Sequence, residues 1–322
     1  MCAGYPLASS LLRGLSAWLD SCDPSVHWVP SARNRIIQVR EKFGSLNDFE
    51  GILRRLEDYE LQRVTATQPT ISRQEPVDDP GAPAEGFYPQ NLRSELISVF
   101  REFFYHNEKL RNEQPNAYDI FAVRKVGPDS TVITFNYDIA LERALARAHK
   151  WDVGNGYGFP FLPNRIASEV TAYKLHGSVN WFKHPINDVP PPVIFTRDLR
   201  LLGYEDLSDL RVGGNGMAVD NSSTFILPDP RKEFYWKSFW EPLWDDAAER
   251  LRAANEVFVL GYSMPPADDR ARRLLFHNID KSAAIKIHCR SVGDRIAEEF
   301  RGLEFTDVRS FPSVDFEAWA AS

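Results

Sequence analysis

TVITFNYDIALERAL, residues 131–145, combines a short apolar run, a polar triplet (residues 136–138) and an amphipathic segment in that order. Val132, Ile133 and Phe135 favour a β-strand, because β-branched and aromatic side chains predominate in strands. After the triplet the apolar residues recur at the spacing of one helix face. A strand that ends in polar residues directly before a helix is where open α/β sheets bind their ligands. The stretch therefore predicts an α/β sheet with a ligand site at the polar triplet.

Two further predicted strands end in the same way. AYKLHGSVNW, residues 172–181, contains a short strand that ends in His176, Gly177 and Ser178. VFVLGYS, residues 257–263, ends in Gly261, Tyr262 and Ser263, and Asp268 then enters a helix. Glycine lets a ligand approach the backbone closely, serine supplies a hydroxyl, and a helix N-terminus favours an anion. Three polar strand ends of this kind predict a dinucleotide-binding crevice.

The C-terminal part of the chain alternates strands with helices. The hydrophobic pattern predicts strands over 223–228, 256–263, 284–289 and 304–311, and helices over 238–255, 267–279, 292–300 and 314–320. Strands that alternate with helices of this length are typical of parallel, right-handed connections. We therefore expect an α/β fold with a Rossmann-like, doubly wound, mostly parallel sheet.

The residues before the polar triplet are predicted to be mostly helical. Apolar stripes indicate helices over 7–19, 45–62 and 92–110, and a short helix is expected near 117–125. Residues 66–89 are rich in proline and poor in aliphatic side chains, so they predict a disordered loop. We interpret 35–125 as a helical insertion or subdomain and 183–222 as a loop-rich insertion, both within a single domain of residues 1–322.

Composition argues against several function classes. The formal charge of −7 disfavours nucleic acid or an anionic membrane as the main partner. No stretch has the length and apolarity of a membrane span, and the N-terminus lacks a secretory signal pattern, so we expect a cytoplasmic protein. The three cysteines cannot supply the four thiolates of an all-cysteine zinc site. Only a mixed Cys/His site stays open, and we expect no metal.

Each candidate residue also has a simpler structural explanation. Asn136 and Asp138 could cap the helix that follows them, because Asn and Asp are preferred at helix N-termini. His176 could be a satisfied structural histidine, and Gly177 and Ser178 could simply form a turn. The recurrence of polar residues at three strand ends favours the ligand-site interpretation over these explanations.

The motifs, taken in order, resemble those of a known family. TFNYD, KLHGS followed by Trp181, ILPDPRK and VLGYSMPPAD, spread over residues 131–268, look like the serial motifs of the SIR2-like (sirtuin-related) NAD-binding family. The resemblance is closest to the bacterial branch associated with anti-phage defence. CAGYP, residues 2–6, resembles the segment that follows this family's glycine loop. Together they cover most of the chain outside 35–125 and 183–222 and imply a DHS-like NAD-binding fold.

The resemblance implies a role for each matching residue. Asn136 would bind the nicotinamide ribose and help to position the attacking water, and His176 would act as general base, so these two are the expected catalytic residues. Asp138 would hold the nicotinamide carboxamide. Gly261 and Ser263 would contact the phosphates or the adenosine ribose, and Asp268 would order their loop. The other expected cofactor-binding residues are Ala3, Gly4, Tyr5, Pro6, Thr134, Gly177, Ser178 and Tyr262.

Two departures from the family bear on function. Deacylating sirtuins carry a four-cysteine zinc module and a segment that clamps an acyl-lysine peptide, and neither has a match here. The family's GAGxS loop and its strand should precede CAGYP, where this sequence begins. Either the natural start lies upstream or the phosphate-binding loop has been lost. We favour the first, because a sheet without its first strand would bury less core and expose an edge.

The expected function is that of an NAD+-consuming hydrolase, with NAD+ as co-substrate, that releases nicotinamide and ADP-ribose. Such an enzyme would be a defence-type effector that assembles with a second copy or with a defence-system protein. The alternatives are a non-catalytic module that senses NAD+ or ADP-ribose, and an NAD-dependent protein deacylase or ADP-ribosyltransferase. A metal hydrolase built on Asn136, Asp138 and His176 is disfavoured, since the sequence offers no further ligand cluster.

Overall fold

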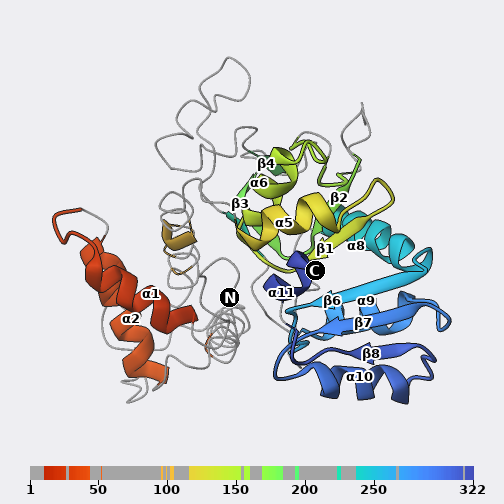
Figure 1. The fold of residues 1–322 in the computed structure, drawn as a ribbon. Helices are drawn as coiled ribbons and strands as arrows, with labels where there is room; N and C mark the ends of the chain where they lie inside the picture. The colour runs from red at the N-terminus through yellow and green to blue at the C-terminus, as the bar shows by residue number, and fades with distance from the viewer. Residues whose placement is uncertain are drawn as a thin grey trace, which may run out of the picture. The chain divides into compact units, whose positions relative to one another are not determined.

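The chain divides into two compact units. The computed structural model describes residues 11–26, 29–43, 52, 96, 99, 102–104, 116–153, 156–159, 169–183, 193–195, 223–225, 237–265, 268–314 and 316–322. Pro6–Phe103 form one unit, the helical unit; Met1–Tyr5 with Phe104–Ser322 form the other, the sheet unit. Figure 1 colours both along the chain. The predicted loop 66–89 and most of 183–222 lie outside the described residues.

Two described helices belong to the helical unit. α1 (Leu11–Ser21) buries Leu12, Leu15 and Leu19 on one stripe, in the region where a helix is predicted. α2 (Val29–Phe43) was not predicted, because its sequence contains many charged residues and only a weak apolar stripe. Arg33 of α2 donates to the carbonyl oxygen of Leu19 from Nε and Nη2, at 2.9 and 2.7 Å. The same carbonyl also accepts the Cys22 amide at 3.2 Å, so Arg33 adds further donors at the end of α1.

Parts of the two long predicted helices of this region are described. Within 45–62 and 92–110, the described residues are Ile52, Leu96, Val99 and 102–104, and all of them are helical. The remainder of both helices lies outside the described residues. The helical unit begins at Pro6, whereas the insertion was predicted to span 35–125.

Three small sheets form the strand part of the sheet unit. β1 (Thr131–Thr134) pairs in parallel with β2 (Thr171–Lys174). β7 (Ala284–His288) lies between β6 (Glu256–Leu260) and β8 (Val308–Ser310), also in parallel. β3 (Gly177–Lys183) pairs antiparallel with β4 (Val193–Phe195) and β5 (Ser223–Phe225). The fold is therefore mixed α/β with two short parallel sheets.

The antiparallel sheet departs from the expected alternation of parallel strands with helices. β3 and β4 were not predicted, and β5 was expected to continue the parallel pattern, whereas it runs antiparallel to β3. β3 follows β2 after only Leu175 and His176. Such a short connection cannot form the crossover that a parallel neighbour requires. Within the described strands, the β1–β2 and β6–β7–β8 sheets share no strand pairing.

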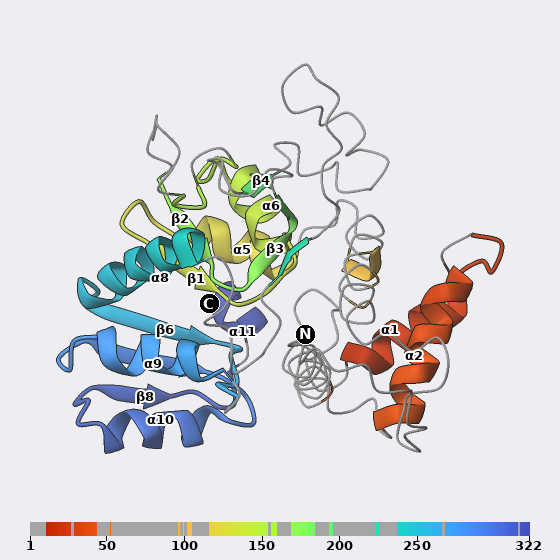
Figure 2. The same cartoon turned by 180° about the vertical axis from the view of Figure 1, so that it is seen from behind.

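Helices surround these sheets where the hydrophobic pattern predicts them. They are α5 (Ala117–Arg124), α6 (Ala140–Arg147), α8 (Lys237–Arg252), α9 (Asp269–Asn278), α10 (Gly293–Gly302) and α11 (Phe316–Ala321). Figure 1 and Figure 2 show α9 and α10 on one face of the β6–β7–β8 sheet, with α11 on the other. Helices therefore cover both faces of this sheet.

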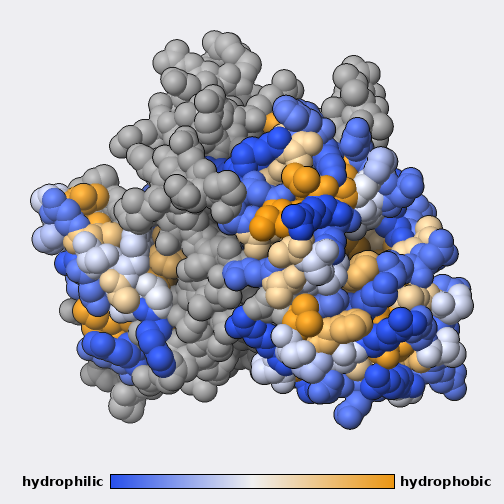
Figure 3. Space-filling model, viewed as in Figure 1, coloured by the Kyte–Doolittle hydropathy of each residue, from blue (hydrophilic) through white to orange (hydrophobic). Residues whose placement is uncertain are grey.

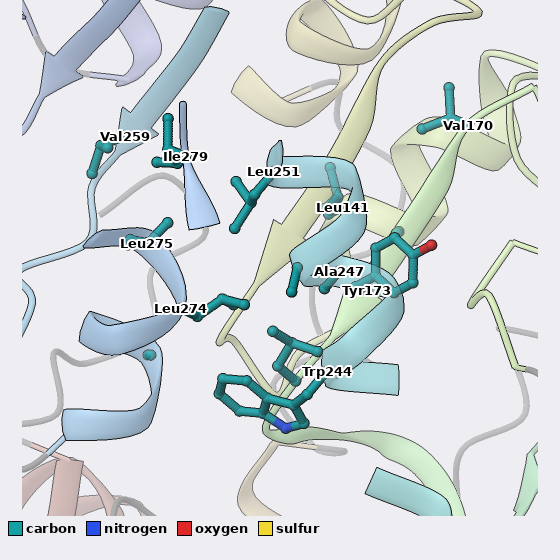
Figure 4. Packing of buried hydrophobic residues seen from close by; sticks show 14 of the residues in the cluster. Leu141, Val170, Tyr173, Trp244, Ala247, Leu251, Val259, Leu274, Leu275 and Ile279 are labelled. Carbon is teal, nitrogen blue, oxygen red and sulfur yellow. The ribbon is translucent and has the colours of Figure 1, made fainter. Parts of the chain in front are cut away.

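α8 forms the centre of the hydrophobic core. Figure 4 shows its side chains Trp244, Ala247 and Leu251 between two sets of residues. Leu141 of α6 and Tyr173 of β2 lie on one side, and Leu274 and Leu275 of α9 lie on the other. The α8 helix therefore packs the β1–β2 sheet and the β6–β7–β8 sheet into one core.

The described surface on the face seen in Figure 3 is largely polar. Figure 3 shows small hydrophobic areas scattered among hydrophilic residues on the described part of one face. Ile120 and Val123 of α5 are among the large hydrophobic residues that are exposed. No helix within the described ranges is both long enough and apolar enough to cross a membrane.

Candidate functional site

The carboxyl ends of β1, β2 and β6 meet at the side chain of Phe135. Its ring centroid lies 4.9 Å from that of His176, which follows β2, and 4.6 Å from that of Tyr262, which follows β6. The Trp244 ring of α8 lies 6.4 Å from both Phe135 and His176. The structure thus brings the three sequence-predicted strand ends into one cluster of rings. Phe135 and Trp244 are two members of this cluster that sequence analysis did not single out.

His176 and Asp268 lie at the centre of this cluster. His176 Nε2 is 3.3 Å from Asp268 Oδ1, and the two side chains are only 4% and 2% exposed. Tyr262 donates its hydroxyl hydrogen to the other carboxylate oxygen, Oδ2, at 2.7 Å. A buried carboxylate needs such donors, because burial of an unpaired charge is very costly. Asp268 therefore links the segment after β2 to the segment after β6.

Asp268 stands at the N-cap position of α9 but makes no capping hydrogen bond with its side chain. An aspartate in this position ordinarily accepts a hydrogen bond from an amide of the first turn. Here its oxygens face His176 and Tyr262 instead. When the imidazole is neutral and Nε2–H donates to the carboxylate, Nδ1 is the proton acceptor of the ring. The pair can therefore hold a histidine base in one tautomer and orientation, as the aspartate does in a Ser-His-Asp triad.

The two polar side chains of the turn after β1 have different environments. Asp138 is buried, and its Oδ1 accepts a hydrogen bond from the Ala140 amide at 3.1 Å, at the start of α6. This contact is an Asx turn directly before α6; the N-cap residue of α6 is Ile139, and it makes no side-chain capping hydrogen bond. Asn136 is exposed; its backbone amide donates to Thr134 Oγ1 at 3.1 Å, and its Nδ2 lies 3.5 Å from the Tyr118 hydroxyl. Of the two, only Asn136 offers its side chain to solvent.

Gly177 and Ser178 connect this turn to the His176 turn. Gly177 has a φ of 88°, in the left-handed region that favours glycine. Ser178 is fully buried. The Tyr137 carbonyl oxygen accepts hydrogen bonds from Ser178 Oγ at 3.5 Å and from the Val179 amide at 2.9 Å. The Ser178 hydroxyl is therefore used inside the fold, where it helps to hold the two turns together.

In the loop after β6, the backbone amide of Gly261 already has a hydrogen-bond acceptor. Gly261 adopts a φ of 63° and donates its amide hydrogen to the His288 carbonyl oxygen at 3.0 Å. That amide cannot at the same time bind a phosphate. Ser263, two residues on, is exposed. Of these two expected phosphate or ribose contacts, Ser263 is the one whose side chain faces solvent.

Two arginines hold the same loop from α9 and α10. Arg295 donates to the Ser263 carbonyl oxygen at 2.6 Å, and Arg272 donates to that of Met264 at 3.2 Å. Both guanidinium groups also pair with the carboxylate of Glu299. We call Arg272, Arg295 and Glu299 the arginine clamp. It places positive charge beside the loop and fixes the backbone at two successive carbonyls.

A buried polar cluster lies beside the turn after β1, and sequence analysis missed it. Lys174 at the end of β2 and Glu142 of α6 are fully buried, with Nζ and Oε1 2.7 Å apart, and Lys174 also donates to the Asp138 carbonyl oxygen. The Tyr157 hydroxyl lies 3.4 Å from Glu142 Oε1 and 3.0 Å from Asn180 Nδ2. Burial raises the pKa of Glu142, although the Lys174 ammonium opposes this shift. The lysine in AYKLHG was a usable signal, because a lysine within an apolar strand is almost never buried unless it is paired.

Other expected features remain predictions. Ala3, Gly4, Tyr5 and Pro6 lie outside the described residues. In the described ranges, no three His, Cys, Asp or Glu side chains are grouped as a metal ion would require. A scan of the sequence against protein-family models found no match, and neither did a search of curated proteins.

Proposed function

We propose that the chain is an NAD+-consuming hydrolase of the SIR2-like type, built on a doubly wound α/β fold, which releases nicotinamide and ADP-ribose from NAD+. The observation that carries this proposal is the 3.3 Å contact between His176 and Asp268 where three strand ends meet. A histidine held by a carboxylate is suited to general-base chemistry. The exposed amide of Asn136 on the neighbouring turn adds a group able to bind a ribose hydroxyl.

In this proposal His176 is the general base. Asp268 and Tyr262 hold the imidazole, and Nδ1 accepts a proton from water as the water oxygen bonds to the ribose C1′. The electron pair of the breaking C1′–N bond goes to the nicotinamide nitrogen, so nicotinamide leaves as a neutral molecule and needs no strong acid. A positioned base of this kind contributes roughly 10²–10⁴-fold to the rate.

A non-catalytic module that binds NAD+ or ADP-ribose is the second candidate. Two observations favour it: His176 is 4% exposed, and the Gly261 amide donates to a neighbouring strand. A base covered by rings cannot reach water until those rings move. A binding module, by contrast, needs no accessible base.

The test is nicotinamide release from NAD+ by the purified full chain, measured by chromatography. We expect turnover in the wild type and a loss of about 10²-fold or more in His176→Ala, the scale for removal of a general base. His277→Ala, on the exposed side of α9, is the matched control and should leave the rate unchanged. Equal rates in His176→Ala and wild type would contradict the proposal. Binding of NAD+ without any turnover would support the sensing module instead.

Several wider features belong to the same proposal. The defence-type role, and assembly with a second copy or a defence-system protein, rest on the motif resemblance. A cytoplasmic location is proposed from composition alone.

A further inference from the structure

Lys174 and Glu142 form an ion pair in the protein interior, where the desolvation of both charges costs free energy. Both side chains are fully buried. The attraction between buried charges often fails to exceed the desolvation cost, so an apolar pair of similar volume is often as stable or more stable. Lys174 also lies beside the first turn of α6, where the helix dipole disfavours a cation. Stability alone therefore does not account for this pair.

The contacts of Lys174 point to another role. Three carbonyl oxygens of the segment that starts at the end of β1 accept hydrogen bonds from the segment that starts at the end of β2. The Thr134 carbonyl accepts from the Leu175 amide at 3.1 Å, and that of Tyr137 accepts from the Val179 amide at 2.9 Å. The third, that of Asp138, accepts from the Lys174 ammonium.

The third contact differs from the other two. Backbone amides make the first two contacts, so most side chains could occupy those positions. The contact with Asp138 requires a long side chain with a donor at its end. Glu142 Oε1, 2.7 Å from Nζ, keeps that donor in place, and the Tyr157 hydroxyl lies 3.4 Å from the same oxygen.

We propose that Lys174, held by Glu142, is a positioning residue that fixes the Asn136–Asp138 turn against the turn that carries His176. The inference deepens the proposed function and rests on it, because it assigns how the two expected catalytic residues keep their relative placement. Lys174 touches the Asp138 backbone and acts through that turn, not on the reacting atoms.

The test separates stability from activity with two variants. Lys174→Met/Glu142→Leu replaces the pair by apolar side chains, so we expect a thermal midpoint equal to or above that of the wild type. Its kcat for nicotinamide release should nevertheless fall about 10- to 100-fold, the scale for a displaced catalytic group. Glu142→Gln keeps the acceptor for Lys174, so it should lower stability but retain more activity than the double variant.

A control pair and a second measurement complete the design. Lys286→Met/Glu256→Leu removes an ion pair between β6 and β7 and should not change kcat. Amide exchange reports on the turn directly: Ala140, whose amide donates to Asp138 Oδ1, should exchange at least about tenfold faster in the Lys174→Met/Glu142→Leu variant.

Failure of the positioning role and failure of the proposed function give different results. Wild-type kcat and unchanged Ala140 exchange in the double variant would overturn the positioning role. If the wild type itself releases no nicotinamide, the proposed function fails, and the exchange of Ala140 still decides whether Lys174 holds the turn.

Discussion

The His176 imidazole contacts the Asp268 carboxylate at 3.3 Å, although the two residues follow strands of different sheets. His176 follows β2, and Asp268 follows β6 and precedes α9. The contact therefore joins the two parallel sheets at their carboxyl ends. Because both side chains are buried, a change in either one should affect the function and the local packing together.

Asp268→Asn should lower nicotinamide release by between about 10² and 10⁴-fold, because loss of an orienting carboxylate leaves a histidine base in the wrong tautomer. Tyr262→Phe is the matched comparison. It keeps the ring beside Phe135 and removes only the hydroxyl that reaches Asp268 Oδ2. It should therefore have the smaller effect. Steady-state rates of nicotinamide release compare the two variants, and thermal unfolding checks that both are folded. A larger loss of rate in Tyr262→Phe than in Asp268→Asn would contradict the role given to Asp268.

Glu299→Gln should loosen the loop after β6 with little effect on global stability. Glu299 pairs with Arg272 and Arg295, which donate to the Met264 and Ser263 carbonyl oxygens. These side chains are partly exposed, so the loss of unfolding free energy should be less than about 1 kcal/mol. Hydrogen exchange of residues 261–264 should nevertheless increase. Unchanged exchange there would show that the backbone holds the loop without the arginine clamp.

Gly156→Ala should destabilise the sheet unit, whereas Gly127→Ala should not. A Cβ at Gly156 would overlap the indole of Trp151, which is buried, while a Cβ at Gly127 would meet nothing within 4 Å. Overpacking of this kind costs about 1–3 kcal/mol. Gly127→Ala should change the unfolding free energy by less than about 1 kcal/mol. Denaturant unfolding measures both, and equal stabilities would contradict the packing around Trp151.

His288→Phe should reduce the stability that the protein loses when the pH falls into the mildly acidic range. Burial is the main cause that lowers the pKa of His288, and the nearby Lys286 and Lys125 ammonium groups add to it. A histidine whose pKa is lower in the folded state contributes stability that is present above its unfolded pKa, about 6.5, and is lost as the pH falls through its folded pKa. Phenylalanine keeps the stacked contact with Phe311, whose ring lies 4.7 Å away.

Thermal midpoints between about pH 7.5 and pH 4.5 would check this prediction, with the window set by the unfolded histidine pKa of about 6.5. The wild type should lose more stability than His288→Phe as the pH falls below that value. The same substitution at His277, which is exposed on α9, is the control. Parallel curves for wild type and His288→Phe would contradict the assignment.

The regular elements of the sheet unit were predictable because their signals are local. The helices α6, α8, α9 and α10 each carry an apolar stripe within their own sequence, and β7 alternates the buried Ile285 and Ile287 with other side chains. β4 and β5 have three residues each, and β5 lies antiparallel to β3. Such short strands are defined by the strand with which they pair, and three residues alone do not indicate that partner.

Some residues of the candidate site could likewise be predicted from sequence, and others could not. The residues at the strand ends, His176, Tyr262 and Asp268 among them, stand in short motifs and could be selected from sequence. Trp244 lies in the middle of α8, where its pattern indicates only a buried face. Lys174 could be noticed as a charge in an apolar strand, but its pairing with Glu142 depends on how α6 packs against β2.

Local patterns are enough to show which polar residues follow β1, β2 and β6, because strand propensity and the polar residues after a strand are local properties of the chain. The contacts that those residues make depend on tertiary packing. Asp138 accepts the Ala140 amide in an Asx turn before α6, while Asp268, at the N-cap position of α9, faces His176 and Tyr262. The physical reason is that a buried carboxylate bonds to whichever donors lie within about 3 Å, and packing of distant segments sets which donors those are.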